Sequence, residues 1–273
     1  MPNPALNEQV LRRVAEEDRA GWAAPSAGGQ GTGTWAPPID DGPISPYRRA
    51  VMTTSGVVTA TGVLLVILVA TGLIGWSSVD ADPTGVSIPG WVFLPLLAGL
   101  GLAIASAFKP AWARVTGPLY AACQGLVLGA ISKAYSLEYD GIVVQAVGLT
   151  VVVVAAMLFA YATRLIRVTE RVRSTVMVAT LGIAVFYGLS LLLRLFSVDM
   201  PFIWDAGPFG ILFSLVVIGI AAFNLLLDFD LVERGTQAGL PKYMEWYAAF
   251  GLMVTVVWLY LEILRLLAKL RER

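Results

Sequence analysis

The residues best placed to do chemistry are acids inside two long apolar stretches near the end of the chain. Asp228 follows three leucines, and Glu262 follows the run Leu-Tyr-Leu. A charged side chain at the centre of a hydrocarbon span costs roughly 2.5–3.5 kcal/mol on insertion scales, so such residues are candidates for function. Two carboxylates close together in a medium of low dielectric constant cannot both ionise cheaply. We therefore expect Asp228 and Glu262 to share a proton, and their titration to change the contact between two helices.

The same two carboxylates would offer oxygen ligands to a calcium ion. Calcium takes about six to eight oxygen ligands, so Asp228 and Glu262 alone would make a weak and incomplete site. Low affinity suits a permeating ion, which must leave a site as well as enter it. We therefore predict calcium or another cation as a passing ion, and no resident cofactor.

Other polar residues are predicted to support this pair. Asn224 lies one turn before Asp228, where it would either bond to that acid or link two helices. Arg265 follows Glu262 by three residues, so a local ion pair that tethers the helix end is the alternative to a gating role for Glu262. Gln124 is expected to bond between helices or to line a pathway.

The depths of the acids leave further alternatives open. Asp228 lies about 30 Å along its predicted helix at 1.5 Å per residue. The alternative is therefore that it lies at the level of the membrane interface, where an acidic side chain costs little free energy. Asp230 points to another side of the same helix and is favoured as an ordinary interfacial acid. The next predicted helix enters the membrane from the cytosolic side, and Glu262 lies about 22 Å along it. The predicted depths of Asp228 and Glu262 therefore differ. Glu245, near the start of that helix, is then the alternative acid at the depth of Asp228.

Composition sets the class of protein. Hydrophobic residues make up 57% of the chain and charged residues only 14%, with a mean hydropathy of +0.74. Ordinary soluble domains carry about 25% charged residues, so we predict an integral membrane protein. The net charge is zero, so the chain has no overall positive field that would attract nucleic acid. It contains no histidine, which excludes imidazole zinc sites and Ser-His-Asp triads. An enzyme is not expected.

Apolar windows long enough to cross a bilayer recur along the chain. About 20 helical residues span the hydrocarbon, and unpaired strand edges are not tolerated in lipid, so we predict an all-α bundle of seven transmembrane helices. Small residues such as Gly125 and Gly129 are predicted to let these helices pack closely. The predicted windows are 51–76, 91–108, 115–134, 141–165, 174–196, 208–231 and 247–267.

Residues 1–47 are predicted to form a flexible tail, because a Gly/Pro/Ser/Thr-rich tract cannot bury enough apolar surface to fold, and residues 48–273 form the helical domain. Basic residues place the N-terminus in the cytoplasm. The last span is predicted to cross completely, although it carries a basic end to the outer side. The bases assigned to the inner side are Arg48, Arg49, Lys109, Arg114, Arg164, Arg167, Arg171, Arg173, Arg234 and Lys242.

Three segments in the third, sixth and seventh spans share their order with a known family. They are PLYAACQGLVLGAIS at 118–132, Leu-Asp at 227–228 and WLYLEILRLL at 258–267. On these segments the chain resembles the Bax inhibitor (YccA-like) family, whose members contain the transmembrane Bax inhibitor motif. It resembles the actinobacterial branch in particular, over roughly residues 47–273.

The resemblance implies a pH-sensitive calcium leak in the bacterial inner membrane, through a seven-helix bundle whose last helix is central. Asp228 and Glu262 match the positions of two aspartates that hold the pore shut in that family. The longer Glu262 changes the reach of one acid, Asp230 replaces an amide, and a second-helix arginine has no clear match, Lys109 being the nearest base. The family also implies an alternative, a non-conducting membrane partner that modulates a membrane protease or a stress response.

Overall fold

The computed structural model describes residues 51–79, 89–196 and 206–272. The predicted tail at 1–47 lies outside these residues, so its boundary with the helical domain at 48–273 stays a prediction. Within the described residues, helices long and apolar enough to cross a membrane number seven, which confirms the predicted all-α bundle.

The helices follow the predicted windows to within a few residues, and the third, sixth and seventh spans are longer than predicted. The helix expected at 208–231 continues to Gln237, and the one expected at 247–267 runs from Met244 to Arg271. Short 3-10 turns precede the second and third spans at Gly90–Val92 (η2) and Pro110–Trp112 (η3). The helices are α2 Thr54–Ser77, α3 Phe93–Phe108, α4 Ala113–Glu138, α5 Ile142–Ala162, α6 Glu170–Leu195, α8 Pro208–Gln237 and α9 Met244–Arg271.

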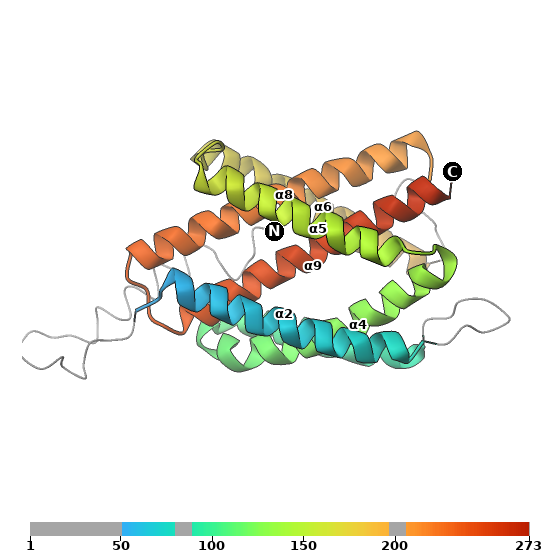
Figure 1. The fold of residues 1–273 in the computed structure, drawn as a ribbon, viewed down its shortest axis with the longest axis horizontal. Coiled ribbons are helices and arrows are strands. Elements are labelled where there is room, and N and C mark those ends of the chain that lie inside the picture. Colours follow the sequence, from blue (N-terminus) through green and yellow to red (C-terminus); the bar gives the residue numbers. More distant parts are fainter. Residues whose placement is uncertain (1–50, 80–88, 197–205, 273) are drawn as a thin grey trace, which may run out of the picture.

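Helix α9 occupies the centre of the bundle, as predicted. It packs against α2, α4, α5 and α8, and Figure 1 shows it passing between α2 on one side and α5 and α8 on the other. Its apolar window is also the most buried of the seven, at 61%. Four helices are therefore organised around the helix that carries Glu262, whereas α3 packs on α4 and α6 packs on α8.

Helix α9 also crosses the bundle completely. Its approach begins beside the start of α2, where Val51 forms a β-bridge with Pro241. Its far end reaches the turn between α4 and α5, where Arg271 donates to the Asp140 carbonyl oxygen and to Gln145 Oε1, the latter at 3.0 Å. The predicted full crossing of the last span is therefore what the structure has.

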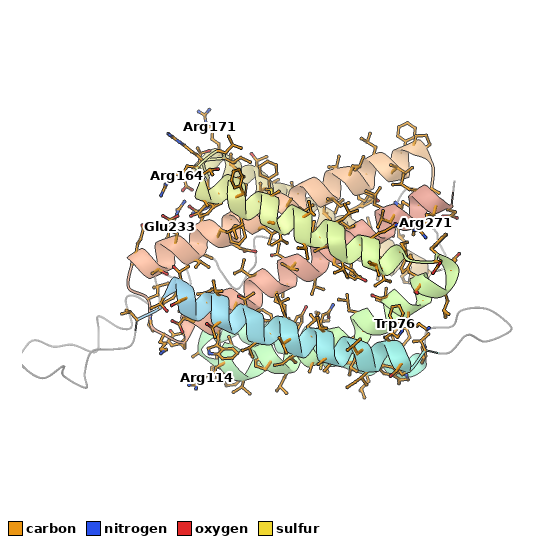
Figure 2. The ribbon with its side chains drawn as sticks, viewed as in Figure 1. Trp76, Arg114, Arg164, Arg171, Glu233 and Arg271 are labelled. Carbon is orange, nitrogen blue, oxygen red and sulfur yellow. The ribbon has the colours of Figure 1, made fainter. Side chains whose placement is uncertain are left out.

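The two ends of the bundle differ in charge. Figure 2 shows Arg114, Arg164 and Arg171 at the same end as Glu233, whereas Trp76 and Arg271 lie at the opposite end. We call the end with Arg114, Arg164 and Arg171 the basic end. Three of the arginines assigned to the inner side therefore lie at one end of the bundle, and the side of the membrane that this end faces stays a prediction.

Helices α2 and α4 approach each other without side chains between them. A Cβ atom added to Gly129 would lie 1.9 Å from the carbonyl oxygen of Gly72, and one added to Gly75 would lie 2.2 Å from that of Leu126. Such distances are far inside van der Waals contact, so only glycine fits at either position. The prediction that small residues in the third span serve helix packing is confirmed.

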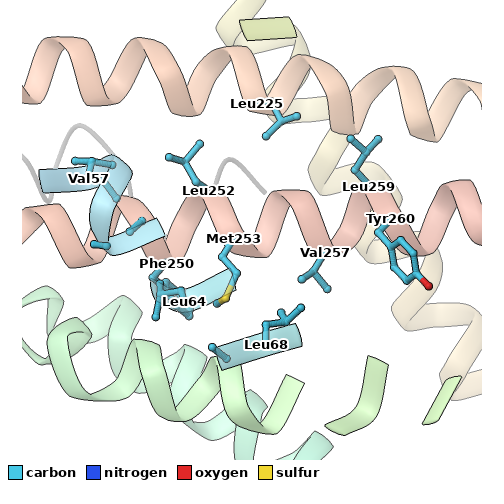
Figure 3. Packing of buried hydrophobic residues seen from close by; sticks show 14 of the residues in the cluster. Val57, Leu64, Leu68, Leu225, Phe250, Leu252, Met253, Val257, Leu259 and Tyr260 are labelled. Atoms are coloured by element: carbon cyan, nitrogen blue, oxygen red, sulfur yellow. The ribbon is translucent and has the colours of Figure 1, made fainter. Parts of the chain in front are cut away.

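Aliphatic side chains of α9 fill the core on two opposite faces. In Figure 3, Leu252 and Leu259 point toward α8, where Leu225 lies, whereas Met253 and Val257 point toward α2. Leu225, Met253 and Leu259 are each 0% exposed. Van der Waals packing holds helices together in lipid, so these contacts fix the rotation of α9 and hence the direction of its polar side chains.

Candidate functional site

Asp228 lies inside the α8–α9 contact and is only 5% exposed. Its Oδ2 atom accepts a hydrogen bond of 2.6 Å from the hydroxyl of Thr255 on α9. Helix α8 continues nine residues beyond Asp228, or about 14 Å at 1.5 Å per residue. The acid is therefore packed within the bundle, and its depth in the membrane, on which the alternative depends, stays a prediction.

Glu262 is 2% exposed and has several donors around it. Its Oε1 atom accepts from the Tyr187 hydroxyl at 2.9 Å, from Trp258 Nε1 at 3.3 Å and from Arg265 at 3.1 Å. The Arg265 guanidinium also donates to the Tyr187 hydroxyl at 2.8 Å and lies 5.2 Å from the centre of that ring. The predicted local ion pair exists, and through Tyr187 it reaches across to α6.

Asp228 and Glu262 do not form the direct pair that the sequence predicts. In the described part of the chain no hydrogen bond joins their carboxyl groups; Asp228 meets α9 at Thr255, seven residues before Glu262. Seven residues correspond to about 10 Å along a helix. The reason is register, because α8 and α9 are antiparallel and Asp228 lies nearer the basic end than Glu262 does. Described acidic or thiol side chains do not gather in groups of three or more that could hold a metal ion. The weak calcium site of these two acids stays a prediction.

Asn224 links α8 to α6 and does not bond to Asp228. Its amide nitrogen donates to the Thr180 hydroxyl at 2.8 Å and to the Ile220 carbonyl oxygen at 2.9 Å. The structure therefore has the second of the two predicted alternatives for Asn224. Gln124, half-buried on α4, makes no hydrogen bond with the described residues, so neither of its predicted roles is visible.

Asp230 belongs to an ion-pair cluster at the basic end. Its Oδ2 atom lies 2.8 Å from Arg173 and 2.7 Å from Arg234, and Arg234 in turn lies 3.7 Å from Glu170. These contacts tie the end of α8 to the start of α6. They fit the interpretation of Asp230 as an interfacial acid and leave it no contact with Asp228.

Glu245 fastens the start of α9 to the start of α2. It is 5% exposed, and its Oε1 atom accepts from the backbone nitrogen of Thr53 at 2.9 Å and from the Thr53 hydroxyl at 2.8 Å. Thr53 is the N-cap of α2, where a carboxylate is favoured by the helix dipole. A Cβ atom on the neighbouring Gly56 would lie 2.1 Å from the Glu245 carboxyl, so that glycine leaves room for the acid. Glu245 therefore joins two helices and is not the alternative partner of Asp228.

Lys269 adds a buried base at the opposite end of α9. It is 3% exposed, and its ammonium donates to the Gly210 carbonyl oxygen and to the Ser214 hydroxyl, both at 3.0 Å. The burial of this lysine is not predicted from the sequence. Its contacts place the first turns of α8 beside the last turns of α9.

Polar residues at intervals of seven connect these contacts along the bundle. On α6 they are Arg173, Thr180 and Tyr187, and on α9 they are Thr255, Glu262 and Lys269. Seven residues are two turns, so each set lies on one face of its helix. We call the resulting chain of contacts the polar series; from the basic end it comprises Arg173–Asp230, Thr255–Asp228, Thr180–Asn224, Tyr187–Glu262–Arg265 and Lys269–Ser214.

The comparison with known families agrees with this architecture. A family model described as Bax inhibitor 1 like matches residues 3–272. The chain belongs to the Bax inhibitor 1 like family. The match also covers residues before 47, which the resemblance seen in the sequence left out. A search of curated proteins returned no match.

Membership in the Bax inhibitor 1 like family makes this a membrane protein of a group linked to ion and calcium leak. Within the family, the YccA-like and actinobacterial assignments stay predictions. Sequence reasoning found Asp228 and Glu262 but missed Thr255, Tyr187 and Thr180, which bond to the acids and to Asn224. The spacing of seven along α6 and α9 is the signal that would have found them.

Proposed function

We propose that this protein is a pH-sensitive leak for cations, calcium foremost, in a bacterial inner membrane, with its N-terminus in the cytoplasm. The passage follows the polar series between α6, α8 and α9. The observation that carries the proposal is the placing of two nearly fully buried acids, Asp228 and Glu262, two turns apart along that series.

Asp228 is the proton-responsive group in this proposal. Its contact with α9 is a single hydroxyl donor, and no described base bonds to it, so an ionised Asp228 carries a charge that its neighbours do not compensate. A buried uncompensated charge is costly unless water reaches it. Protonation of Asp228 therefore changes the stability of the water-free contact between α8 and α9. This contact in turn decides whether the passage admits water and ions.

Glu262 provides a second acidic position for the cation. Its charge is compensated by Arg265, and the Tyr187 hydroxyl holds the pair against α6. In the open state a cation would compete with Arg265 for this carboxylate. Each acid supplies too few oxygens for tight binding, so the ion moves on, as a leak requires.

The test is calcium flux into liposomes that contain the full chain, measured across a series of pH values. We expect the wild-type flux to depend on pH and Asp228→Asn to lose that dependence, because asparagine keeps an acceptor for Thr255 but does not titrate. We expect Glu262→Gln to lower the flux itself. Glu138→Gln is the control, since it removes an exposed acid at the end of α4, outside the polar series, and it should keep the pH dependence.

A flux whose pH dependence survives in Asp228→Asn would contradict the role given to this acid. A wild-type protein that passes no cation at any pH would contradict the leak altogether. It would favour the alternative function, a non-conducting partner that modulates a membrane protease or stress response through helix contacts.

A further inference from the structure

An apolar crevice runs between α2 and α5, with α9 at its floor. Two cavities of about 610 Å³ and 410 Å³ form it, and they share Leu65 of α2 and Val256 of α9 as lining residues. The larger cavity is lined by α2, α5, α8 and α9, and the smaller by α2, α4, α5 and α9. Each volume falls within the roughly 300–1,000 Å³ of small-molecule sites, so the crevice has room for an extended apolar chain. Figure 1 shows α2 and α5 on either side of α9.

A polar cavity borders the crevice at the basic end. This third cavity, of about 300 Å³, shares Tyr161 and Glu233 with the larger apolar cavity, so the two adjoin at these side chains. Its lining includes Arg164, Arg167 and Arg234. We call this polar cavity the mouth of the crevice. An apolar crevice with guanidinium groups at its mouth is complementary to a molecule with an apolar tail and an anionic head.

The acids in this mouth already have partners. Glu233 accepts from the Tyr161 hydroxyl and lies 3.2 Å from Arg164. Asp230 is held by Arg234 at 2.7 Å and by Arg173, which approaches from α6. The acids therefore do not offer an incoming anion a free negative charge.

Arg167 is the base best placed to receive an anion. It is exposed in the connection between α5 and α6, and the described residues give it no hydrogen bond or ion pair. Arg164, in the same connection, has a positive φ of 52°, which L side chains rarely adopt, and this turn keeps its guanidinium at the mouth beside Glu233. The loop thus presents two guanidinium groups to the end of the crevice.

We propose that this crevice binds one anionic phospholipid from the leaflet at the basic end. Its phosphate lies against Arg167 and Arg164, and one acyl chain lies between α2 and α5 along the face of α9. A zwitterionic lipid would add a cation beside the guanidinium groups, and free phosphate would leave the crevice unfilled. Basic pockets between transmembrane helices are suited to anionic headgroups for the same reason. The site meets the polar series only at Asp230, in the lining of its mouth, so lipid binding does not depend on conduction.

The test titrates the purified full chain in detergent with dioleoyl phosphatidylglycerol or dioleoyl phosphatidylcholine and counts bound lipid by native mass spectrometry. We expect the anionic lipid to bind several-fold more tightly. Arg167→Gln should weaken phosphatidylglycerol binding by about fivefold, the effect typical of one basic residue near an anionic headgroup, and leave phosphatidylcholine unchanged. Arg171→Gln is the matched control, because this exposed arginine does not line the mouth.

A second variant tests the apolar part of the site. Gly62 lines the larger cavity, and a Cβ atom added there would have no neighbouring atom within 4 Å, so Gly62→Leu would place a side chain in the crevice. It should reduce binding of both lipids, whereas Gly101→Leu on α3, at an equally open position, should not. Equal affinity for the two lipids, or equal effects of Arg167→Gln and Arg171→Gln, would overturn the proposal. Full displacement of phosphatidylglycerol by inorganic phosphate would also overturn it, by showing a site for phosphate alone.

Discussion

Asp228 on α8 and Glu262 on α9 both carry buried carboxylates, yet the surroundings of the two differ completely. Glu262 receives hydrogen bonds from a guanidinium, a phenol and an indole, and Arg265 compensates its charge. Asp228 receives one bond, from the neutral hydroxyl of Thr255. The comparison shows that two buried acids can differ in charge balance: a cation compensates the carboxylate of Glu262, whereas Asp228 has only a neutral donor, which is why we propose Asp228 as the group that responds to a proton.

Removing the compensating charge should have the largest effect on stability. Arg265→Met leaves the buried carboxylate of Glu262 without its cation, and breaking a buried ion pair on one side typically costs about 3–5 kcal/mol. We expect a loss of that order in the free energy of unfolding, measured by chemical denaturation in detergent micelles. The double variant Glu262→Gln with Arg265→Met should regain most of it, since neither charge remains. If the single variant were no less stable than the double, Glu262 would not depend on Arg265.

Removing the donor to Asp228 should have a smaller effect. Thr255→Val keeps the shape of the side chain but takes away the hydroxyl, so Asp228 loses its bond across the helix contact. Leaving a buried polar group without a partner costs about 1–3 kcal/mol, and we expect a loss in that range in the same denaturation assay. Thr255→Ser, which keeps the hydroxyl, is the control and should stay close to the wild type. Equal stability of the valine and serine variants would show that the bond contributes nothing.

The smallest effect is expected at Tyr187. Tyr187→Phe removes one donor from Glu262, but Arg265 and Trp258 still bond to that carboxylate, so the loss should be about 1 kcal/mol. Tyr247→Phe provides the control, because the Tyr247 hydroxyl is buried without a hydrogen-bond partner among the described residues and its removal should cost nothing. Melting temperatures of the two variants that coincide would contradict the bridging role of Tyr187.

The helices of this bundle were predictable because the bilayer fixes their length and composition. Their ends were less so: α8 extends past the predicted residue 231 because Glu233 and Arg234, too polar for a hydropathy window, form ion pairs at the basic end. The apolar windows can be predicted from the transfer of their side chains out of water alone. The last turns of α8 cannot, because their polar side chains depend on partners from other helices.

The pairing of acids could not be predicted in the same way. Whether Asp228 meets Thr255 or Glu262 depends on the rotation and register of α8 against α9, which are set by the packing of side chains such as Leu225 and Leu259. A shift of two turns would be needed to bring Glu262 to the level of Asp228. The sequence identifies the acids as unusual residues, but their partners follow only from the three-dimensional contacts.

The central position of α9 has a consequence for biosynthesis. Chains emerge from the ribosome N-terminus first, so α2 to α8 are made before the helix that they surround. Until α9 inserts, Asp228 has no hydrogen bond from the Thr255 hydroxyl, so its presence in the membrane costs more free energy. A nascent chain stalled between α8 and α9 would contain six hydrophobic helices but lack the central one. The carboxyl group of Asp228 would then have no hydrogen bond from Thr255, and quality control could use this difference to distinguish the stalled chain from the finished protein.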